Sequence, residues 1–350
     1  MSHVLILRFS SMGDVAMTVP ALRCLIKKYP DCKITLATKE EYKPIFREFQ
    51  KLNFHTVDFN NRHKGIKGLW VLFKELKELK PTHIADLHAV IRTYFLCFLF
   101  RINFFKIKRV DKQRRERKKL FRKKNKIFKP LTPVQFKYCE VFNRLGFNID
   151  LTNHEFADPF VINNEAQQII YGINNKLKWI GVAPFASFSG KTYPLDLMQQ
   201  LVAFLQRDYQ VFLFGSGDFE IEKLEIWANA YQNVFGAYKL GSLYNEIEII
   251  SNLDLMISMD SANGHLAANY SVPVITLWGL THPFGGFAPF SSNPENMIVS
   301  NREMFPQIPT SAYGKKIPKG YEKAMRTISY NDVAARCLKI LEDSTRHRNL

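Results

Sequence analysis

The sequence predicts an α/β protein of two doubly wound domains, each with a parallel sheet covered by helices on both faces. Three observations predict it. The chain has 350 residues, enough for two domains of roughly 100–200 residues each. Short apolar runs without polar alternation, typical of strands buried on both faces, alternate with helix-like stretches. This alternation occurs in residues 1–160 and again in residues 175–325, so we expect two domains facing each other across a cleft.

In the first half, four continuous apolar runs predict buried strands, at Val4–Phe9, Lys33–Ala37, His55–Phe59 and His83–Leu87. Helices are expected between them, at Val15–Tyr29, Glu40–Phe49 and Gly68–Leu79. Further along, Tyr94–Phe105 is either a core helix or an apolar stretch that dips into a membrane interface. A polar helix at Lys112–Lys126 and a further helix at Val134–Leu145 complete this half.

The second half follows a crossover over residues 146–176, which contains a helix at Glu165–Asn174. The expected strands are Trp179–Ala183, Gln210–Phe214, Leu255–Ser258 and Val272–Leu277. The expected helices are Leu195–Gln206, Asp218–Tyr231, Leu243–Ser251 and Asn263–Tyr270. In the terminal segment 326–350, an amphipathic helix at Asn331–Leu341 is expected to pack back on the first domain. Ligands of such sheets bind at the carboxyl ends of the strands, so the residues just after each strand are the informative ones.

The charge of the protein is concentrated in one segment. The chain has 49 Lys and Arg against 32 Asp and Glu, a net charge of +17. Residues 106–129 contain fourteen of the basic residues and only two acidic ones, a net of +12. Such a run is typical of a solvated face or of a nucleic-acid arm. Its few aromatic residues, Phe121 and Phe128, and the lack of a known nucleic-acid motif argue against nucleic acid as the partner.

Cysteine usage and hydropathy indicate a protein of a reducing compartment. The five cysteines form no C-x-x-C pair and cannot all be bridged, which argues against a disulfide framework or a thiolate zinc site. The first apolar run is too short for a signal peptide, and no run reaches the ~18 apolar residues that a spanning helix needs. We therefore expect a soluble, cytoplasmic protein.

The turn after the first strand, Ser10-Ser11-Met12-Gly13-Asp14, places a carboxylate near the start of a helix. An ordinary N-cap is one interpretation of Asp14. The other is a general base, because a carboxylate at the positive end of a helix can take a proton from a hydroxyl group.

Three strand ends in the second half carry small residues and charges suited to phosphate. Ser187 and Lys191 lie in a small-residue loop that lacks P-loop spacing, which argues against nucleoside-triphosphate hydrolysis. Gly215 and Ser216 follow the next strand. The run Asp260–His265 opens a helix whose N–H groups suit an anion, although Asp260 capping that helix is the alternative. Together these loops indicate a bound diphosphate nucleotide.

These residues carry a family resemblance. The turn Ser10–Asp14, Lys191 in its small-residue loop, and the run Asp260–Pro283 resemble glycosyltransferase family 9, the ADP-heptose:lipopolysaccharide heptosyltransferases. Ala262 stands where the family usually has glycine. The resemblance implies two facing Rossmann-like domains in the GT-B arrangement, with parallel sheets and an interdomain cleft. Residues 1–160 would bind the acceptor, and 175–325 the nucleotide sugar.

The resemblance also implies roles for individual residues. Asp14 would be the base for the acceptor hydroxyl, and Lys191 would bind and stabilise the leaving diphosphate. Ser11 and Gly13 would lie on the acceptor side. The donor-binding residues would be Ser187, Lys191, Gly215, Ser216, Asp260, Ser261, Gly264 and His265, with Glu220 as the candidate for the ribose. No cofactor is implied. The sequence has no Asp-x-Asp motif, so we expect metal-independent transfer, and the resemblance implies inversion at the anomeric carbon.

The basic segment then becomes a candidate for the anionic acceptor and for the inner face of the cytoplasmic membrane, where each Lys or Arg contributes ~1 kcal/mol. The candidate acceptor residues are Arg62, Lys64, Arg92, Lys112, Arg114, Arg115, Lys118 and Lys119. Two alternatives remain open: a nucleic-acid-binding protein that uses residues 106–129, and an inactive homologue that only binds anionic glycan.

Overall fold

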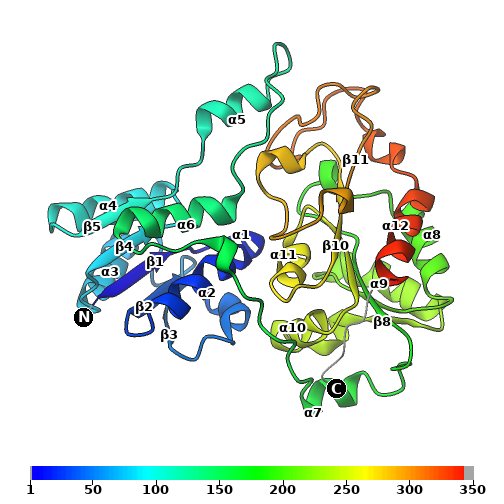
Figure 1. Cartoon of the computed structure of the whole chain (residues 1–350), viewed down its shortest axis with the longest axis horizontal. Helices are drawn as coiled ribbons and strands as arrows, with labels where there is room; N and C mark the ends of the chain where they lie inside the picture. The colour runs from blue at the N-terminus through cyan, green and yellow to red at the C-terminus, as the bar shows by residue number, and fades with distance from the viewer. Residues whose placement is uncertain (1, 343–350) are drawn as a thin grey trace. The chain divides into compact units, whose positions relative to one another are not determined.

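The structure, a computed structural model, describes residues 2–342. The chain divides into two compact units. The first comprises Met1–Arg114 and Thr132–Glu155, and the second comprises Arg115–Leu131 and Phe156–Leu350. Each unit contains one parallel sheet with helices on both faces, so the predicted fold class is confirmed (Figure 1).

The first unit is built on a five-stranded parallel sheet in the order β3-β2-β1-β4-β5. Its strands are β1 (His3–Leu7), β2 (Lys33–Thr38), β3 (Leu52–Thr56), β4 (His83–Asp86) and β5 (Lys106–Arg109). The chain leaves β1 toward β2 on one side and later returns to β4 on the other side. The strand order therefore reverses between β1 and β4, and a ligand site is expected at their carboxyl ends.

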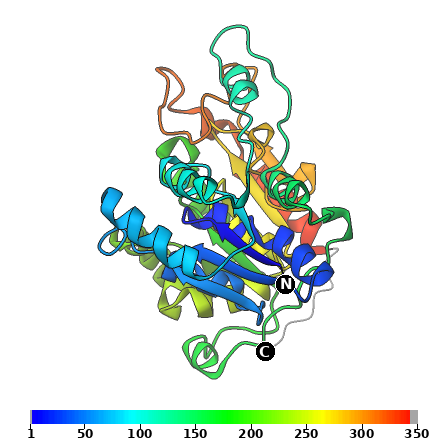
Figure 2. The same ribbon diagram turned by 90° about the vertical axis from the view of Figure 1, so that its left-hand side faces the viewer.

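Helices cover both faces of this sheet (Figure 2). On one face, α3 (Gly65–Glu78) packs on α4 (Ile91–Ile102), and both share a core with Leu5 and Leu7 of β1. On the other face, α2 (Val19–Lys28) packs on α6 (Val134–Leu145), which also contacts β4 and β5.

The second unit has a six-stranded parallel sheet in the order β11-β10-β9-β6-β7-β8. Its strands are β6 (Trp179–Ala183), β7 (Gln210–Leu213), β8 (Val234–Gly236), β9 (Leu255–Met259), β10 (Val274–Trp278) and β11 (Met297–Val299). Here the strand order reverses between β6 and β9, which pair with each other. The carboxyl ends of these two strands form the second expected ligand site.

The helices of the second unit divide between the two faces of its sheet. One face carries α8 (Leu195–Leu205), α9 (Asp218–Ala230) and α12 (Tyr330–Glu342), whose apolar side chains join one core with the strands. On the other face, α10 (Leu243–Ser251) packs on α11 (Ala262–Ala268), which contacts β9 and β10. A short helix, α7 (Asn164–Ile169), precedes the sheet.

Most expected elements are present, with shifted ends. The single helix expected at Val15–Tyr29 is two helices, α1 (Met12–Ala16) and α2, because Pro20 lacks an N–H and begins a new helix. The third strand begins three residues before its expected start, at Leu52. Strands β5, β8 and β11 were not expected. They are sheet-edge strands of three or four residues, and β5 is hidden in a run of lysine and arginine.

From the sequence, the basic residues 106–129 are expected to form one insertion in the acceptor-binding domain 1–160, but the structure divides them between the two units. Strand β5 belongs to the first sheet, whereas residues 115–131 belong to the second unit. The anchors are apolar and backbone contacts: Leu120 is buried, and the N–H of Leu131 donates to the carbonyl of Phe284 at 2.9 Å. The polar helix within it, α5 (Arg114–Leu120), is shorter than expected. We refer to residues 115–131 as the basic strap.

The expectation for the last helix is also wrong. Helix α12 packs on α8 of the second unit, and Val333, Cys337 and Leu341 lie in the core of that unit. These apolar side chains repeat on one face of α12. That face packs on α8 and β9 of its own unit. The remainder of the predicted segment, residues 343–350, lies outside the described residues.

The interpretation of Tyr94–Phe105 as a core helix is confirmed for the inner face of α4, and the membrane-interface alternative stays a prediction. Its inner face, with Leu96, Cys97, Leu99 and Phe100, is buried, as expected for a core helix. Its outer face exposes 62% of Phe98 and 58% of Ile102. Between residues 2 and 342, no helix has the length and apolar character that crossing a bilayer requires.

Candidate active site

The carboxylate of Asp14 lies where the strand order of the first sheet reverses. It follows β1 on the first turn of α1, and it accepts a hydrogen bond from the Ser11 hydroxyl at 3.2 Å. Arg8 forms an ion pair with the same carboxylate. The N-cap position belongs to Ser11, so the interpretation of Asp14 as a helix cap is wrong. The Asp14 side chain is 28% exposed, so the two donors orient it while one side stays open.

Two residues that the sequence did not single out hold this carboxylate in place. Arg8 is buried at the end of β1 and donates to the carbonyl of Leu87 at 2.8 Å, which ties it to the end of β4. Tyr138 of α6 is fully buried, and its hydroxyl donates to the carbonyl of Asp14 at 3.4 Å. A charge at the end of a strongly apolar strand was the available signal for Arg8. No local signal existed for Tyr138, which lies 124 residues away from Asp14.

His88, which follows β4, is influenced by the charge of Asp14 and by several positive charges. Burial, followed by the charges of Arg8 and Lys112, lowers the pKa of His88 to about 3, against an opposing effect of Asp14 and a smaller contribution of Arg92. The ring is therefore neutral at pH 7, and its Nδ1 accepts a hydrogen bond from the backbone N–H of Phe9. Of the predicted acceptor residues, Ser11 thus contacts Asp14, and Arg92 and Lys112 lie close enough to His88 to lower its pKa.

Other basic residues near this site are engaged by partners of their own. Asp86 is fully buried and accepts a hydrogen bond from Arg109 of β5 at 2.6 Å. Arg114 donates to the hydroxyl of Tyr94 at 2.8 Å. Arg115, Lys118 and Lys119 belong to the second unit, so the structure does not bring all the predicted acceptor residues into one unit.

The loop with Arg62 and Lys64 contains a cluster of two histidines and a glutamate. Nε2 of both His55 and His63 lies about 3 Å from the same carboxylate oxygen of Glu75, and Arg62 pairs with the other oxygen at 2.5 Å. Nδ1 of His63 accepts a hydrogen bond from the backbone N–H of Asp58, so its ring proton is on Nε2 and points to Glu75. A metal ligand would need that nitrogen unprotonated. The cluster therefore fits a hydrogen-bonded network, and Arg62 belongs to this network through its ion pair with Glu75.

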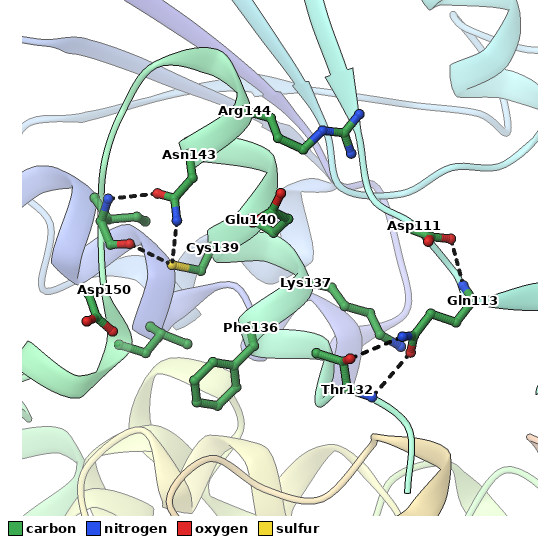
Figure 3. A pocket seen from close by; sticks show the side chains of 12 residues that line it. Asp111, Gln113, Thr132, Phe136, Lys137, Cys139, Glu140, Asn143, Arg144 and Asp150 are labelled. Carbon is green, nitrogen blue, oxygen red and sulfur yellow. Dashed lines mark hydrogen bonds between the residues drawn. The ribbon is translucent and has the colours of Figure 1, made fainter. Parts of the chain in front are cut away.

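The first unit also contains a pocket of about 510 Å³ between α6 and the segment after β5 (Figure 3). Gln113 closes one end through two hydrogen bonds with Thr132, and Asn143 and Cys139 bond to the backbone of Ile149 at the other end. Its lining mixes acidic and basic side chains: Asp111, Glu140 and Asp150 with Lys137 and Arg144. This balance does not favour an anion, so the pocket is not a candidate for an anionic acceptor.

In the second unit, Lys191 and Asp260 meet where the strand order reverses between β6 and β9. The Lys191 ammonium lies 2.8 Å from the Asp260 carboxylate and donates to the Asp260 carbonyl at 3.1 Å. Both side chains are largely buried, with 13% and 6% exposure. Asp260 therefore holds the lysine, and the N-cap of α11 is Ser261, so the interpretation of Asp260 as a cap is wrong. An ammonium has three donors, so one remains available for an anion.

The remaining predicted donor residues surround this pair on neighbouring loops. Ser261 shares a hydrogen bond with Ser258 at 3.1 Å, and a Cβ on Gly264 would lie 3.1 Å from the Ser258 hydroxyl. Gly264 is thus required for close packing of α11 on β9. His265, on the next position, is buried. Ser187 is exposed in the loop after β6.

Glu220 folds back over the loop that follows β7. Its carboxylate accepts a hydrogen bond from the backbone N–H of Ser216 at 2.9 Å, and a Cβ on Gly215 would lie 3.2 Å from it. This contact keeps an acidic group beside the loop after β7, one strand away from Lys191 in the sheet.

The loop after β10, Gly279–His282, is fastened to the loop that carries Lys191. The N–H of Leu280 donates to the carbonyl of Gly190 at 2.8 Å, and a Cβ on Gly279 would lie 2.5 Å from that carbonyl. Thr281 is 3% exposed, and within residues 2–342 its hydroxyl has no hydrogen-bond partner. Buried polar groups are normally satisfied, so a water molecule or a ligand is expected to supply a partner for this hydroxyl.

Two α/β units, each with a parallel sheet, are the architecture of the GT-B class of glycosyltransferases. The comparisons agree with this class. Residues 72–316 match the sequence profile of glycosyltransferase family 9 (heptosyltransferase). The chain therefore belongs to this family, and it is a glycosyltransferase.

Relatives over nearly the full length carry the same activity in their names. Lipooligosaccharide heptosyltransferase 2 of Campylobacter jejuni is 23% identical, with 95% of this chain and 96% of that protein covered. The lipopolysaccharide core heptosyltransferase OpsX of Haemophilus influenzae is 24% identical, with 84% and 83% covered. Among solved structures, a family 9 glycosyltransferase from Veillonella parvula has a TM-score of 0.75 at 20% identity, with 98% of each chain covered. An ADP-heptose lipopolysaccharide heptosyltransferase II of E. coli has a TM-score of 0.68 at 16% identity, with 98% and 99% covered.

Proposed function

We propose that this glycosyltransferase moves a heptose from ADP-heptose to an anionic inner-core acceptor of lipopolysaccharide, with inversion at the anomeric carbon and without a metal. The names of the relatives support the sugar and the acceptor. A fold neighbour, the E. coli heptosyltransferase WaaC, was solved with ADP-2-deoxy-2-fluoro heptose. Its sequence is 17% identical, with 96% of this chain and 99% of that chain covered, and its TM-score is 0.63.

In the proposed reaction, the carboxylate of Asp14 takes the proton of an acceptor hydroxyl as its oxygen attacks the anomeric carbon. The bond between that carbon and the diphosphate oxygen breaks, and ADP leaves with the electron pair. Attack opposite the leaving group inverts the configuration. Arg8 and Ser11 orient the Asp14 carboxylate, and Tyr138 holds its backbone.

The leaving diphosphate is stabilised by groups that are already in place in the second unit. The remaining donor of the Lys191 ammonium points to it, while Asp260 fixes the lysine. Ser187, Ser261, Gly264 and His265 would surround the phosphates, and Glu220 with Gly215 and Ser216 would contact the ribose. The buried hydroxyl of Thr281 would gain its partner from the same ligand.

The acceptor is proposed to be anionic because Arg8 pairs with the proposed base and further positive charges act on His88 in the same unit. Arg92 and Lys112 lie close enough to shift the pKa of His88 beside Asp14. The exposed apolar side chains of α4 would hold the first unit at the inner face of the cytoplasmic membrane, where the acceptor lipid is made available.

The observation that carries the proposal is the Asp14 carboxylate, oriented by two donors and still open on one side. The test is a transfer assay with ADP-heptose and a panel of truncated lipopolysaccharide cores, preceded by a thermal-shift panel of nucleotide sugars. A donor at 100 times its Kd stabilises the protein by ~2.7 kcal/mol, so ADP-heptose is expected to give the largest shift. A larger shift with another nucleotide sugar, or transfer from that sugar instead, would reject the proposed donor. Salt-sensitive RNA or DNA binding without any transfer would favour the nucleic-acid alternative.

A further inference from the structure

A second pocket, of about 490 Å³, lies in the second unit between the basic strap and the loop over residues 307–318. The strap contributes Phe121 and Lys123, and the loop contributes Tyr313, Lys315 and Lys316. Figure 1 shows the chain after α5 at the same end of this unit as the loop that follows β11. Among the described residues that line the pocket, none is acidic.

The basic strap is held beside the pocket by Lys126 and Phe128, and most of its other charged side chains are exposed. Lys126 is its one half-buried lysine, and its ammonium donates to the carbonyls of Leu120 and Pro309, at 2.6 and 2.7 Å. Burial, with a smaller effect of Arg302, lowers the pKa of Lys126 to about 8. Lys126 therefore anchors the strap to the loop that lines the pocket.

Phe128 forms the second anchor. The Arg302 guanidinium lies 3.4 Å from the centre of its ring, and the rings of Phe284 and His282 lie 4.6 and 4.9 Å away. His282 ends the loop Gly279–His282, so the strap is attached directly to the loop after β10.

The other lysines and arginines of the strap have no acidic partner. Within residues 2–342, none of them forms an ion pair with a carboxylate. Lys123 therefore adds its full charge to those of Lys315 and Lys316 at the pocket. Three positive charges that have no carboxylate partner among residues 2–342, beside two aromatic rings, fit a ligand that carries phosphate on a ring with apolar faces.

The wall of this pocket touches the lysine of the donor site. Gly314 has φ +63°, and a Cβ there would lie 3.0 Å from Cγ of Lys191. A Cβ on Gly190 would lie 2.4 Å from the Gly314 carbonyl, so the two backbones are in close contact. The N–H of Thr310 donates to the carbonyl of Leu280 at 2.9 Å. Lys191 does not line the pocket, because its ammonium is held by Asp260.

We propose that this pocket binds a phosphate-bearing sugar of the acceptor glycolipid and thereby selects phosphorylated acceptors. The inference rests on the proposed function. It places acceptor recognition on the unit that carries the donor lysine, in addition to the positive charges around Asp14. Gly314, between the lining residues Tyr313 and Lys315, packs closely on the backbone of Gly190, the residue before Lys191.

The test compares two triple variants that remove the same charge. Lys123→Gln, Lys315→Gln and Lys316→Gln change the pocket, and Lys176→Gln, Lys239→Gln and Lys339→Gln change exposed positions elsewhere on the same unit. Each protein is assayed with a truncated lipopolysaccharide core and with the same core after chemical removal of its phosphates.

For the pocket variant, we expect the KM for the phosphorylated core to rise at least about tenfold, which corresponds to one charge-assisted phosphate contact of about 1.4 kcal/mol. Its KM for the dephosphorylated core and for ADP-heptose stays within about twofold of the unaltered enzyme, and the control variant behaves like the unaltered enzyme. An unchanged KM, or an equal rise for both cores, overturns the inference.

Calorimetry that measures direct binding of the two cores separates this inference from the proposed function. If the unaltered enzyme transfers no heptose, the proposed function fails. The pocket is then judged by whether the pocket variant alone loses the preference for the phosphorylated core. If that variant instead loses only affinity for an RNA oligonucleotide, the ligand is a nucleic acid and the inference is wrong.

Discussion

The two units place an ion pair at the same point of their folds, yet they expose opposite members of it. In the first unit, Arg8 is the buried partner, and Asp14 is the exposed one, at 5% and 28%. In the second unit, Asp260 is the more buried partner, and Lys191 is the more exposed one, at 6% and 13%. The first pair thus presents a carboxylate that can accept a proton, and the second presents a cation that can meet a phosphate. The same fold, used twice, thus exposes a carboxylate in one unit and a cation in the other by reversing which charge is buried, as the proposed roles of a base and an anion-stabilising group require.

The largest effect is expected from removing the exposed carboxylate. Asp14→Asn keeps the shape of the side chain but cannot take a proton, so we expect kcat to fall by about 10²–10⁴-fold. ADP-heptose affinity, measured by calorimetry, should stay within about twofold, because Asp14 belongs to the unit without the donor lysine.

Glu155→Gln is the matched control, since Glu155 is an exposed carboxylate of the same unit that also pairs with a basic residue, Lys27. It should leave kcat unchanged. Turnover of Asp14→Asn close to that of the unaltered enzyme would show that Asp14 is not the base.

Removing the exposed cation of the second pair should affect both rate and stability. Lys191→Ala is expected to lower kcat by about 10²–10³-fold and to weaken ADP binding, because the diphosphate loses its charged donor. It also leaves the Asp260 carboxylate buried without its partner, which costs about 3–5 kcal/mol in the free energy of unfolding.

The double variant Lys191→Ala with Asp260→Asn separates the two effects, because the neutral amide needs no ammonium. Most of the stability should return while kcat stays low, as measured by urea denaturation and by transfer assays. Lys223→Ala, which breaks an exposed pair with Glu222, should cost no more than about 1 kcal/mol. Recovery of kcat in the double variant would contradict the role of Lys191.

A smaller effect is expected from pH, and it belongs to the first unit. The pKa of His88 is about 3 in the folded protein, below the ordinary value of 6.5, chiefly because the ring is buried. Between these two values, the unfolded chain binds the extra proton, so stability is complete above pH 6.5 and falls as the pH is lowered. At pH 5, His88 should cost about 2 kcal/mol in the free energy of unfolding.

His88→Asn keeps an acceptor for the Phe9 N–H and removes the titrating ring. Urea denaturation at pH 7 and pH 5 should show a loss on acidification that is smaller by that amount than in the unaltered protein. His154 and His282, whose pKa values are lowered to about 4 mainly by burial, account for part of the remaining loss. An identical pH dependence in both proteins would place the proton elsewhere.

The sequence predicted the exposed member of each pair but not the residues that hold the first one. Asp14 and Lys191 follow strands in small-residue turns, which is a local pattern. Arg8 lies within the run Val4–Phe9, whose other residues are apolar and predict a buried strand. The role of Tyr138 cannot be predicted from a local pattern, because its hydrogen bond to the Asp14 carbonyl joins residues 124 positions apart.

The charge of residues 106–129 singles them out as a candidate binding segment, but it does not predict which unit they belong to. The run of Lys and Arg between residues 106 and 129 hides an edge strand, β5, whose pairing with β4 depends on the sheet rather than on its own sequence. The strap is then attached by Leu120, Phe128 and Leu131, the few apolar residues in a polar run. The position of such a segment depends on partners more than 150 residues away, which periodicity cannot identify.

The smallest expected effect concerns the apolar outer face of α4 and the residue just after it. Phe98 and Phe104 are 62% and 96% exposed, and Arg101 lies between them. Phe98→Glu with Phe104→Glu should lower binding to anionic vesicles by about fivefold or more, because the apolar contact is replaced by repulsion. Tyr171→Glu, at an exposed aromatic residue of the second unit, is the control and should change binding little. If both variants bind vesicles equally well, the outer face of α4 is not the membrane contact. If Tyr171→Glu is the variant that loses binding, the second unit, rather than the first, contacts the membrane.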